Sequence, residues 1–384
     1  MVKPGLTVLQ VIPELDAGGA ERTTLEITQA LVKAGCRSIV VSQGGRMEAE
    51  LAELGGELIR LPVKSKSPAK LWANRKALID IIRREKVDIV HARSRAPAWS
   101  ALWAARATGA HYVTTYHGAY GGTSAPKTLY NSVMARGEIV IANSYYIAEH
   151  VKAVHGVPDE KLVVIQRGVA LESFDPAVID SAKVSALRAE HAPDGQRLAI
   201  LPGRLTDWKG QKVLIEALSL LPREALVGTR FVMFGDAQGR DEYVADLKNA
   251  IGNSNIDEFV RISGHYTDMP ALYAASDMVL APSKRPEAFG RVAVEAQAMG
   301  KPVIASDHGG QRETVIPGET GWLVQPDDAA SLSDAIRQWL EMSAEDLSGL
   351  SSAAQKWARN NFSTALLQEK TLAVYDRVMQ EGPN

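Results

Sequence analysis

The sequence is poor in cysteine and has no long apolar run. Cys36 is the only cysteine among the 384 residues, so no disulfide can form within the chain, which fits a reducing compartment. The apolar run before Glu14 is too short for a secretory signal, and no apolar segment is long enough to cross a bilayer. We therefore expect a cytoplasmic protein, attached at most to the face of a membrane.

Two common motifs are also missing. Neither half of the chain has a Gly-x-Gly-x-x-Gly turn after its first strand, which argues against a bound dinucleotide and makes a nicotinamide oxidoreductase the weakest alternative. No Asp-x-Asp occurs either. The adjacent Asp327 and Asp328 stand where a late helix is expected to begin, which is a capping position.

Charge is unevenly distributed along the chain. The net charge is −2, but residues 1–170 carry +7 and the remainder carries −9. Twelve basic residues fall within 60–110, among them the run Lys64, Lys66, Lys70, Arg75 and Lys76. A cationic face favours an anionic partner, either an acidic substrate or the headgroups of a membrane leaflet, although a merely solvated helix face is an equal alternative. We expect no nucleic-acid partner.

Short β-branched runs alternate with amphipathic helical segments through nearly the whole chain, a pattern typical of parallel sheets with helices on both faces. One series of predicted strands covers 6–12, 38–42, 57–61, 87–92, 111–116, 138–143 and 162–166, and a second covers 197–203, 229–235, 258–264, 277–283, 301–306 and 321–326. An irregular segment separates the two series. We predict one Rossmann-like domain at 1–175, a second at 190–362, and a C-terminal helix at 363–384 that crosses back to the first domain.

The stretch "SKRPEAFGRVAVEAQAMG" places two carboxylates around a helix start. Glu287 lies on the loop after a strand, and Glu295 lies within the following helix. The amides of Ala288, Phe289 and Gly290 precede the helix N-terminus, where an anion is favoured. Carboxylates beside an anion site suit the vicinal hydroxyls of a sugar or ribose. The alternatives are a helix-start carboxylate for Glu287 and a surface ion pair for Glu295.

Two cations flank another strand-to-helix turn, in "LPGRLTDWKGQKV". Arg204 follows the strand, and Lys209 precedes Gly210 at the helix start. Such a pair can clamp a phosphate, since arginine offers a fork and lysine a mobile point charge. Either cation alone could instead cap a surface helix.

Taken together, these motifs resemble glycosyltransferase family 4, whose members have the GT-B architecture of two Rossmann-like domains facing a cleft. The resemblance covers essentially the whole chain and rests on "GGAE" at 18–21, "TTYHG" at 114–118, "GRLTDWKG" at 203–210, "MFGDAQG" at 233–239, "EAFGRVAVE" at 287–295 and "KPVIASDHGGQRETV" at 301–315. It implies that 1–175 is the acceptor-side domain, that 190–362 is the nucleotide-sugar-binding domain, and that the anomeric configuration is retained. Because two cations and a helix N-terminus can neutralise a diphosphate, we expect no metal and no cofactor.

The resemblance implies roles for individual residues. Glu287 would hold the donor sugar, Glu295 the ribose, and Arg204 with Lys209 the diphosphate. His117 would contact the sugar, with a structural histidine as the alternative. The remaining predicted donor-binding residues are Gly18, Gly19, Gly235, Ile262, Ser263, Gly264, Ala288, Phe289 and Gly290.

The acceptor side is predicted from Arg93 and Arg95, two guanidinium forks at a strand end that could hold a carboxylate or phosphate. "HARSRAPAWSA", "TTYHGAYGG" and "KTLYNSVMARGEIVIANS" further resemble lipopolysaccharide core glycosyltransferases, mannosyltransferases among them. We predict metal-independent transfer of a hexose, with GDP-mannose as the leading donor, to an acidic glycolipid or lipopolysaccharide core at the inner membrane. The alternatives are an enzyme resembling a non-hydrolysing UDP-sugar epimerase and a catalytically silent scaffold that binds a nucleotide sugar.

Overall fold

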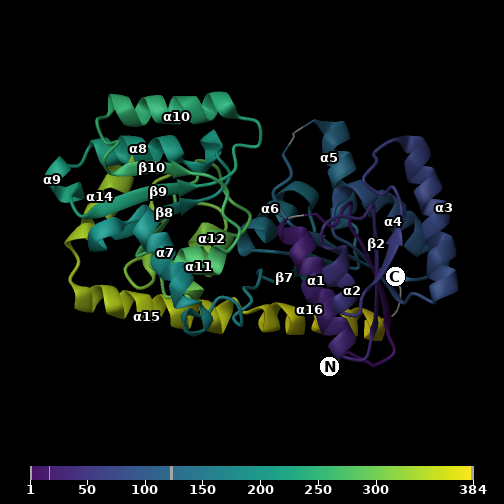
Figure 1. The fold of residues 1–384 in the computed structure, drawn as a ribbon. Coiled ribbons are helices and arrows are strands. Elements are labelled where there is room, and N and C mark those ends of the chain that lie inside the picture. Colours follow the sequence, from purple (N-terminus) through teal and green to yellow (C-terminus); the bar gives the residue numbers. More distant parts are fainter. Residues whose placement is uncertain (1, 17, 122–123, 382–384) are drawn as a thin grey trace. The chain divides into compact units, whose positions relative to one another are not determined.

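The computed structural model describes residues 2–16, 18–121 and 124–381 and divides them into two compact units (Figure 1). Unit 1 runs to Arg167 and includes the C-terminal stretch from Thr364, and unit 2 runs from Gly168 to Ser363. Each unit is built on a parallel sheet covered by helices, so the predicted class of two Rossmann-like α/β domains is confirmed. Gly122 of the quoted motif and the last three residues of the predicted helix at 363–384 lie outside the described residues.

The sheet of unit 1 has the strand order β3-β2-β1-β4-β5-β6-β7. Its strands are β1 (Thr7–Val11), β2 (Arg37–Ser42), β3 (Glu57–Arg60), β4 (Ile89–Ala92), β5 (His111–Tyr116), β6 (Ile139–Ala142) and β7 (Leu162–Val164). Its helices are α1 (Gly19–Lys33), α2 (Glu48–Glu53), α3 (Pro68–Glu85), α4 (Arg95–Thr108), α5 (Ala125–Asn131), α6 (Tyr145–His155) and α16 (Thr364–Glu381). Strands β1 and β4 to β6 are buried along their length, as expected for a parallel sheet with both faces covered.

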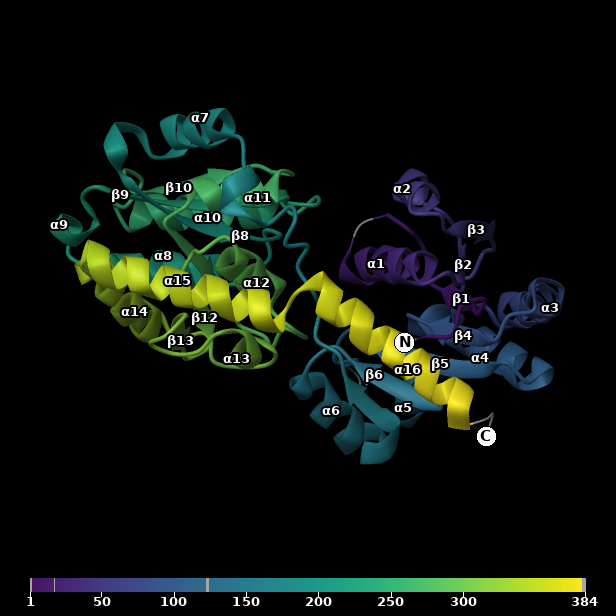
Figure 2. The same cartoon turned by 90° about the horizontal axis from the view of Figure 1, so that it is seen from below.

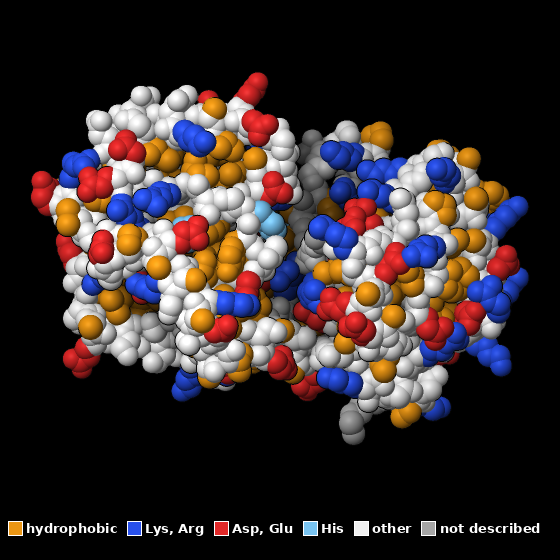
Figure 3. Space-filling model, viewed as in Figure 1, with side chains coloured by type: hydrophobic (Ala, Val, Ile, Leu, Met, Phe, Trp, Pro, Cys, Tyr) orange, Lys and Arg blue, Asp and Glu red, His pale blue; other side chains and the backbone are white. Residues whose placement is uncertain are grey.

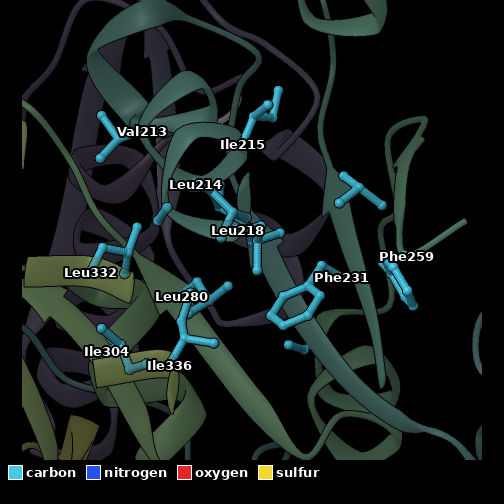
Figure 4. Close-up of a cluster of buried hydrophobic side chains, with 14 of the residues drawn as sticks. Val213, Leu214, Ile215, Leu218, Phe231, Phe259, Leu280, Ile304, Leu332 and Ile336 are labelled. Atoms are coloured by element: carbon cyan, nitrogen blue, oxygen red, sulfur yellow. The ribbon is translucent and has the colours of Figure 1, made fainter. Parts of the chain in front are cut away.

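The sheet of unit 2 has the order β10-β9-β8-β11-β12-β13. Its strands are β8 (Arg197–Pro202), β9 (Thr229–Phe234), β10 (Val260–Ser263), β11 (Met278–Ala281), β12 (Val303–Ser306) and β13 (Gly321–Val324). Its helices are α7 (Ser181–His191), α8 (Gln211–Ser219), α9 (Arg223–Leu226), α10 (Asp241–Asn253), α11 (Met269–Ala275), α12 (Arg291–Ala298), α13 (Gln311–Thr314), α14 (Ala329–Glu341) and α15 (Ala344–Asn361). Figure 4 shows apolar side chains from α8, the central strands and α14 converging in one core of this unit.

The last two helices belong to different units. In unit 2, α15 packs against α12, and Gln355 donates a hydrogen bond to the Ala298 carbonyl at 3.2 Å. In unit 1, α16 (Figure 2) packs against α1. It buries Leu367, Val374 and Tyr375 in the apolar core. Within the described part of the chain, we find no helix long and apolar enough to cross a membrane.

Candidate functional site

The predicted donor residues of unit 2 lie along one edge of its sheet. From β8 the chain proceeds to β9 and β10 on one side, and it then continues to β11 and β12 on the other. The strand order therefore reverses between β8 and β11, which is where open parallel sheets bind ligands at their carboxyl ends. The loop after β8 carries Arg204 and Lys209, and the loop after β11 carries Glu287. Gly235 follows β9, Ile262 and Ser263 end β10 at the same edge, and Gly264 follows β10.

Lys209 and Glu287 form a direct ion pair. The Lys209 Nζ lies 2.8 Å from Oε1 of Glu287, and the two side chains are only 13% and 15% exposed. The Ser283 hydroxyl donates a second hydrogen bond to the same Oε1 at 2.5 Å. Because both bonds end on Oε1, the other carboxylate oxygen of Glu287 accepts neither of them. The structure therefore joins two side chains that were predicted to hold different parts of one ligand.

Glycines allow the loops on both sides of this ion pair to approach closely. Gly210, at φ +80°, begins the turn into α8, and a Cβ there would lie 1.9 Å from the Pro282 carbonyl oxygen. At Gly235, a Cβ would lie 2.0 Å from the carbonyl oxygen of Gly203. Any side chain at either position would push these strand ends apart. Gly235 thus has a structural role that explains it independently of a ligand.

Two further glycines hold the loop that carries Glu287. A Cβ on Gly309 would lie 2.6 Å from the carbonyl oxygen of Glu287, and one on Gly310 would lie 2.4 Å from the Cα of Phe289. The Gly310 amide donates a hydrogen bond to the Glu287 carbonyl at 2.8 Å. The loop after β12 therefore supports the Glu287 loop by backbone contact.

Ala288, Phe289 and Gly290 lead into α12, as predicted. The Phe289 ring is buried and packs edge to face against Phe362, with 5.6 Å between the ring centroids. Only the backbone of Phe289 is therefore suited to a ligand. Gly290 has φ +101° and stands at the start of the helix, where the first amides have no partner within the helix itself.

Glu295 is engaged within its own surroundings. Its Oε1 accepts hydrogen bonds from Arg291, one turn earlier, at 2.6 and 3.1 Å, and its Oε2 accepts one from the Tyr273 hydroxyl at 3.0 Å. Burial, reinforced by the adjacent Glu295 carboxylate, raises the pKa of Tyr273 well above its ordinary value. The alternative interpretation of Glu295 was an ion pair on the surface. The ion pair with Arg291 is present, but the carboxylate is largely buried.

The ring of Trp208 lies near both predicted phosphate ligands. The Lys209 Nζ lies 4.5 Å from the centroid of the Trp208 ring, and the Arg204 guanidinium carbon lies 6.0 Å from it. Cations near a tryptophan face are attracted by its ring quadrupole. Arg204 itself is exposed and its carbonyl accepts a hydrogen bond from Gln211 at 3.1 Å. The sequence prediction missed Trp208, although its position between the two cations could have indicated it.

His308 and Ser283 were also missed. The Nε2 of His308 lies 2.8 Å from the Ser283 carbonyl oxygen, so the imidazole ties the β12 loop to the residue that supports Glu287. Burial lowers the pKa of His308, despite the opposing hydrogen bond to Ser283. The strand-end position of "SDHGG", directly after β12, was the available signal.

In unit 1, His117 follows β5 and lies beside Arg167, which follows β7. The Arg167 Nη2 lies 3.3 Å from Nδ1 of His117. Burial first, and then the charges of Arg167 and Arg93, lower the pKa of His117 well below its ordinary value. A Cβ on Gly19 would lie 1.6 Å from the Arg167 guanidinium, so that guanidinium fills the space that the glycine leaves. Gly18 precedes it at the start of α1.

Arg93 and Arg95 do not form the expected pair of surface forks. Arg93 is only 2% exposed and its Nε donates a hydrogen bond to the Gln10 side chain at 2.6 Å. Arg95 begins α4, where its Nη1 donates to Asn131 at 2.9 Å and its guanidinium lies 4.0 Å from the Tyr120 ring centroid. The two side chains diverge because Arg93 directly continues the buried strand β4, whereas Arg95 is already on the helix.

Arg95 lines a pocket of about 680 Å³ at the carboxyl edge of unit 1. Its other lining residues are Lys66, Ala119, Tyr120, Gly121, Lys127, Tyr130 and Asn131. The pocket thus contains three basic side chains and no carboxylate. The buried hydroxyl of Tyr130 has no hydrogen-bond partner among the described residues. No group of three or more histidine, cysteine or acidic side chains that could hold a metal occurs in the part of the chain that the structure describes.

Two family models match the chain. Residues 17–173 match Glycosyltransferase Family 4, and residues 184–357 match Glycosyl transferases group 1. A crystal structure of a glycosyltransferase from Rickettsia africae is 35% identical, with a TM-score of 0.91 over 98% of this chain and all of that one. The Anabaena protein HepE, solved in complex with UDP and glucose, shares the fold with a TM-score of 0.83 at 23% identity over 97% of this chain and all of that one.

Curated relatives match over shorter stretches. A D-inositol 3-phosphate glycosyltransferase from Xylanimonas cellulosilytica is 32% identical over 53% of this chain, and one from Catenulispora acidiphila is 30% identical over 66% of it. These stretches span 49% and 60% of the relatives' own lengths. Both family models and the Rickettsia match agree with the two-sheet architecture. The chain therefore belongs to glycosyltransferase family 4 and has the GT-B fold.

Proposed function

We propose that this chain transfers a hexose from a nucleoside diphosphate sugar to an acidic acceptor, with retention and without a metal. The observation that carries the proposal is the Lys209–Glu287 ion pair at the point where the strand order of unit 2 reverses. A cation for the diphosphate and a carboxylate for the sugar are held there side by side. The complex of HepE with UDP and glucose supports a donor of this class.

In the proposed reaction, Arg204 and Lys209 stabilise the negative charge of the leaving diphosphate, which is the role that a metal ion has in other transferases. The bond between the anomeric carbon and the phosphate oxygen breaks, and a bond to the acceptor oxygen forms on the same face of the sugar. The acceptor proton moves to the departing phosphate oxygen. Glu287 orients the sugar hydroxyls and takes no part in proton transfer. The predicted contact of His117 with the sugar remains a prediction.

We propose the pocket around Arg95 as the acceptor site. Lys66, Arg95 and Lys127 make it cationic, and the Asn131 bond and the Tyr120 ring hold the Arg95 fork in a fixed orientation. A planar, oriented guanidinium suits a carboxylate or a phosphate on the acceptor. The name of the inositol 3-phosphate relatives is compatible with an anionic acceptor of this kind.

The finer proposal is that the donor is GDP-mannose and the acceptor an acidic glycolipid or lipopolysaccharide core at the cytoplasmic face of the inner membrane. It rests on the sequence resemblance and on the surface of α3. There Trp72 is 54% exposed, with the Arg75 guanidinium 4.7 Å from its ring centroid and Lys70 and Lys76 also exposed. Basic side chains recur over α3 on the face shown in Figure 3. Tryptophan among cations favours an anionic lipid interface.

Binding and transfer assays test these proposals in order. A thermal-shift panel of GDP-, UDP- and ADP-sugars, with and without EDTA, should show one base that stabilises the protein in both conditions. Transfer to phosphorylated and neutral acceptors should then favour the anionic one, and Arg95→Met should raise its KM. If no nucleotide sugar stabilises the protein, the transferase proposal fails. Release of free sugar or an epimer from the donor alone would indicate the epimerase-like alternative.

Cosedimentation with vesicles tests the membrane proposal separately. The protein should bind vesicles that contain anionic lipid, and Trp72→Ala should weaken that binding without affecting transfer to a soluble acceptor. Equal binding of both proteins would remove α3 from the proposal.

A further inference from the structure

A small cavity lies inside unit 1, beneath the carboxyl ends of its central strands. Arg93 follows β4, His117 follows β5 and Asn143 follows β6, and these three strands are neighbours in the sheet. All three side chains line the cavity, as do Thr23 of α1 and Leu367 and Thr371 of α16. Its volume of about 10 Å³ is close to the minimum that admits one water molecule, and it is too small for anything larger.

Each of the three strand-end side chains has one buried polar atom with no hydrogen-bond partner among the described residues. These atoms are Nη2 of Arg93, Nε2 of His117 and Oδ1 of Asn143. Arg93 and Asn143 are each only 2% exposed, so bulk water does not satisfy them. A buried polar group without a partner costs about 1–3 kcal/mol, and three around one cavity would be unusual in a stable fold.

The other contacts of these side chains determine which of the three atoms donate. Arginine has no acceptor, so Arg167, beside Nδ1 of His117, requires that nitrogen to accept. The neutral imidazole then carries its proton on Nε2. The Nδ2 of Asn143 donates to the His117 carbonyl at 3.3 Å, which leaves Oδ1 as an acceptor on the other side of the amide. The three atoms are thus two donors, from Arg93 and His117, and one acceptor, from Asn143, while Arg167, which also lines the cavity, contacts Nδ1 of His117.

One water molecule matches this set of groups. It can accept from Arg93 and from His117 with its two lone pairs and donate one hydrogen to Asn143, which gives the three bonds typical of a buried water. A halide would suit the two donors, but it would repel the Asn143 oxygen and exceed the cavity. We infer that a single buried water joins Arg93, His117 and Asn143, which makes Arg93 and Asn143 positioning residues that fix the ring of His117.

This assignment changes the role of Arg93. It was predicted to hold the acceptor, but it contacts Gln10 on one side and the cavity on the other. Through the water, Arg93 and Asn143 fix the orientation of an imidazole at the rim of unit 1, whose tautomer is set by Arg167. The effect on turnover rests on the proposed function, whereas the water and the tautomer do not.

The primary test needs neither donor nor activity. A crystal structure of the full chain, at a resolution that places waters, should show one peak within hydrogen-bond distance of all three atoms. Side-chain ¹⁵N spectra, with the His117 signals assigned by His117→Gln, should show the Nε2–H tautomer. An empty cavity, direct contact among the three side chains, a bound halide or the Nδ1–H tautomer would each overturn the inference.

Two variants then test the positioning role. Asn143→Leu removes the acceptor, so the water peak should disappear and the His117 ring signals should shift. In the same variant kcat should fall by about tenfold with the donor KM unchanged, because small misplacements at a reacting centre have effects of this size or larger. Thr371→Val is the control. It lines the same cavity, but its hydroxyl already donates to the Leu367 carbonyl at 2.8 Å, so the spectrum and kcat should be unchanged. Equal effects of both variants would contradict the positioning role.

Discussion

Replacing Glu287 by glutamine removes one charge from the Lys209–Glu287 ion pair and keeps its shape. The pair has an N–O distance of 2.8 Å and both side chains are about 85% shielded from solvent, so it is neither a fully buried nor a surface pair. A hydrogen bond to a charged group contributes about 1.5–3 kcal/mol. Glutamine can still accept from Lys209 and Ser283, but it leaves the ammonium uncompensated. We therefore expect unit 2 to lose about 2 kcal/mol of stability.

A double-mutant cycle measures this interaction directly. Unfolding free energies of Glu287→Gln, Lys209→Met and the double variant should give a coupling energy of about 1.5–3 kcal/mol. The melting temperature of a domain of this size should fall by about 4–8 °C in Glu287→Gln. The Arg223–Glu258 pair of the same unit, more than half exposed at 2.6 Å, is the control and should couple by at most about 1 kcal/mol.

Ligand binding gives the same cycle a second readout. In Glu287→Gln the ammonium of Lys209 remains, so a nucleoside diphosphate should bind about as tightly as before, whereas the gain in affinity from an attached sugar should disappear. A coupling energy no larger than that of the surface control would refute the ion-pair argument. If Glu287→Gln also lost affinity for the nucleoside diphosphate itself, the role assigned to Glu287 on the sugar would be contradicted.

Two further predictions concern backbone space and protonation. Gly210→Ala should lower the free energy of unfolding by at least about 2 kcal/mol more than Gly239→Ala does. Both glycines have nearly the same φ (+80° and +77°), but a Cβ would meet a neighbouring carbonyl at Gly210 and nothing within 4 Å at Gly239. Chemical denaturation of both variants measures the difference, and equal losses would contradict the prediction. Burial holds the pKa of His91 well below its ordinary 6.5, so the unfolded chain binds a proton below about pH 6.5 that the folded chain does not. As the pH is lowered, the free energy of unfolding should therefore fall by up to about 1.4 kcal/mol per pH unit for this histidine. His91→Gln should reduce the slope of the free energy of unfolding against pH, measured between pH 7.5 and 5.5. An unchanged slope would exclude His91 as the source.

The sheet edges were predictable from the sequence because strand direction and strand ends are local properties. Arg204, Glu287 and Ser263 each follow a recognisable apolar run, and in a parallel sheet the ends of all strands share one edge. This reasoning needs no knowledge of side-chain conformation. It placed the predicted donor residues of unit 2 on one edge before any of their contacts were known.

Burial at those edges was not predictable in the same way. Arg93 and Arg95 are two positions apart, yet one points into the core toward Gln10 and the other into a cationic pocket. Besides continuing β4, Arg93 lines a cavity that Thr371 of α16 also lines, and α16 begins only at Thr364. A helix that far along the chain leaves no signal near residue 93. Arg167 was missed although, like Arg204, it closely follows a strand.

The ion pair also bears on how one site can select a whole donor. An ammonium has three protons, and only one of those on Lys209 is directed to Glu287, so the others remain for a phosphate without breaking the pair. Similarly, Oε1 of Glu287 accepts from both Lys209 and Ser283, which leaves its second oxygen for a sugar hydroxyl. A ligand with a phosphate and a hydroxyl at the matching separation would satisfy both groups at once. A nucleoside diphosphate or a free sugar would satisfy only one, so under the proposed function the pair would favour the intact nucleotide sugar over either product.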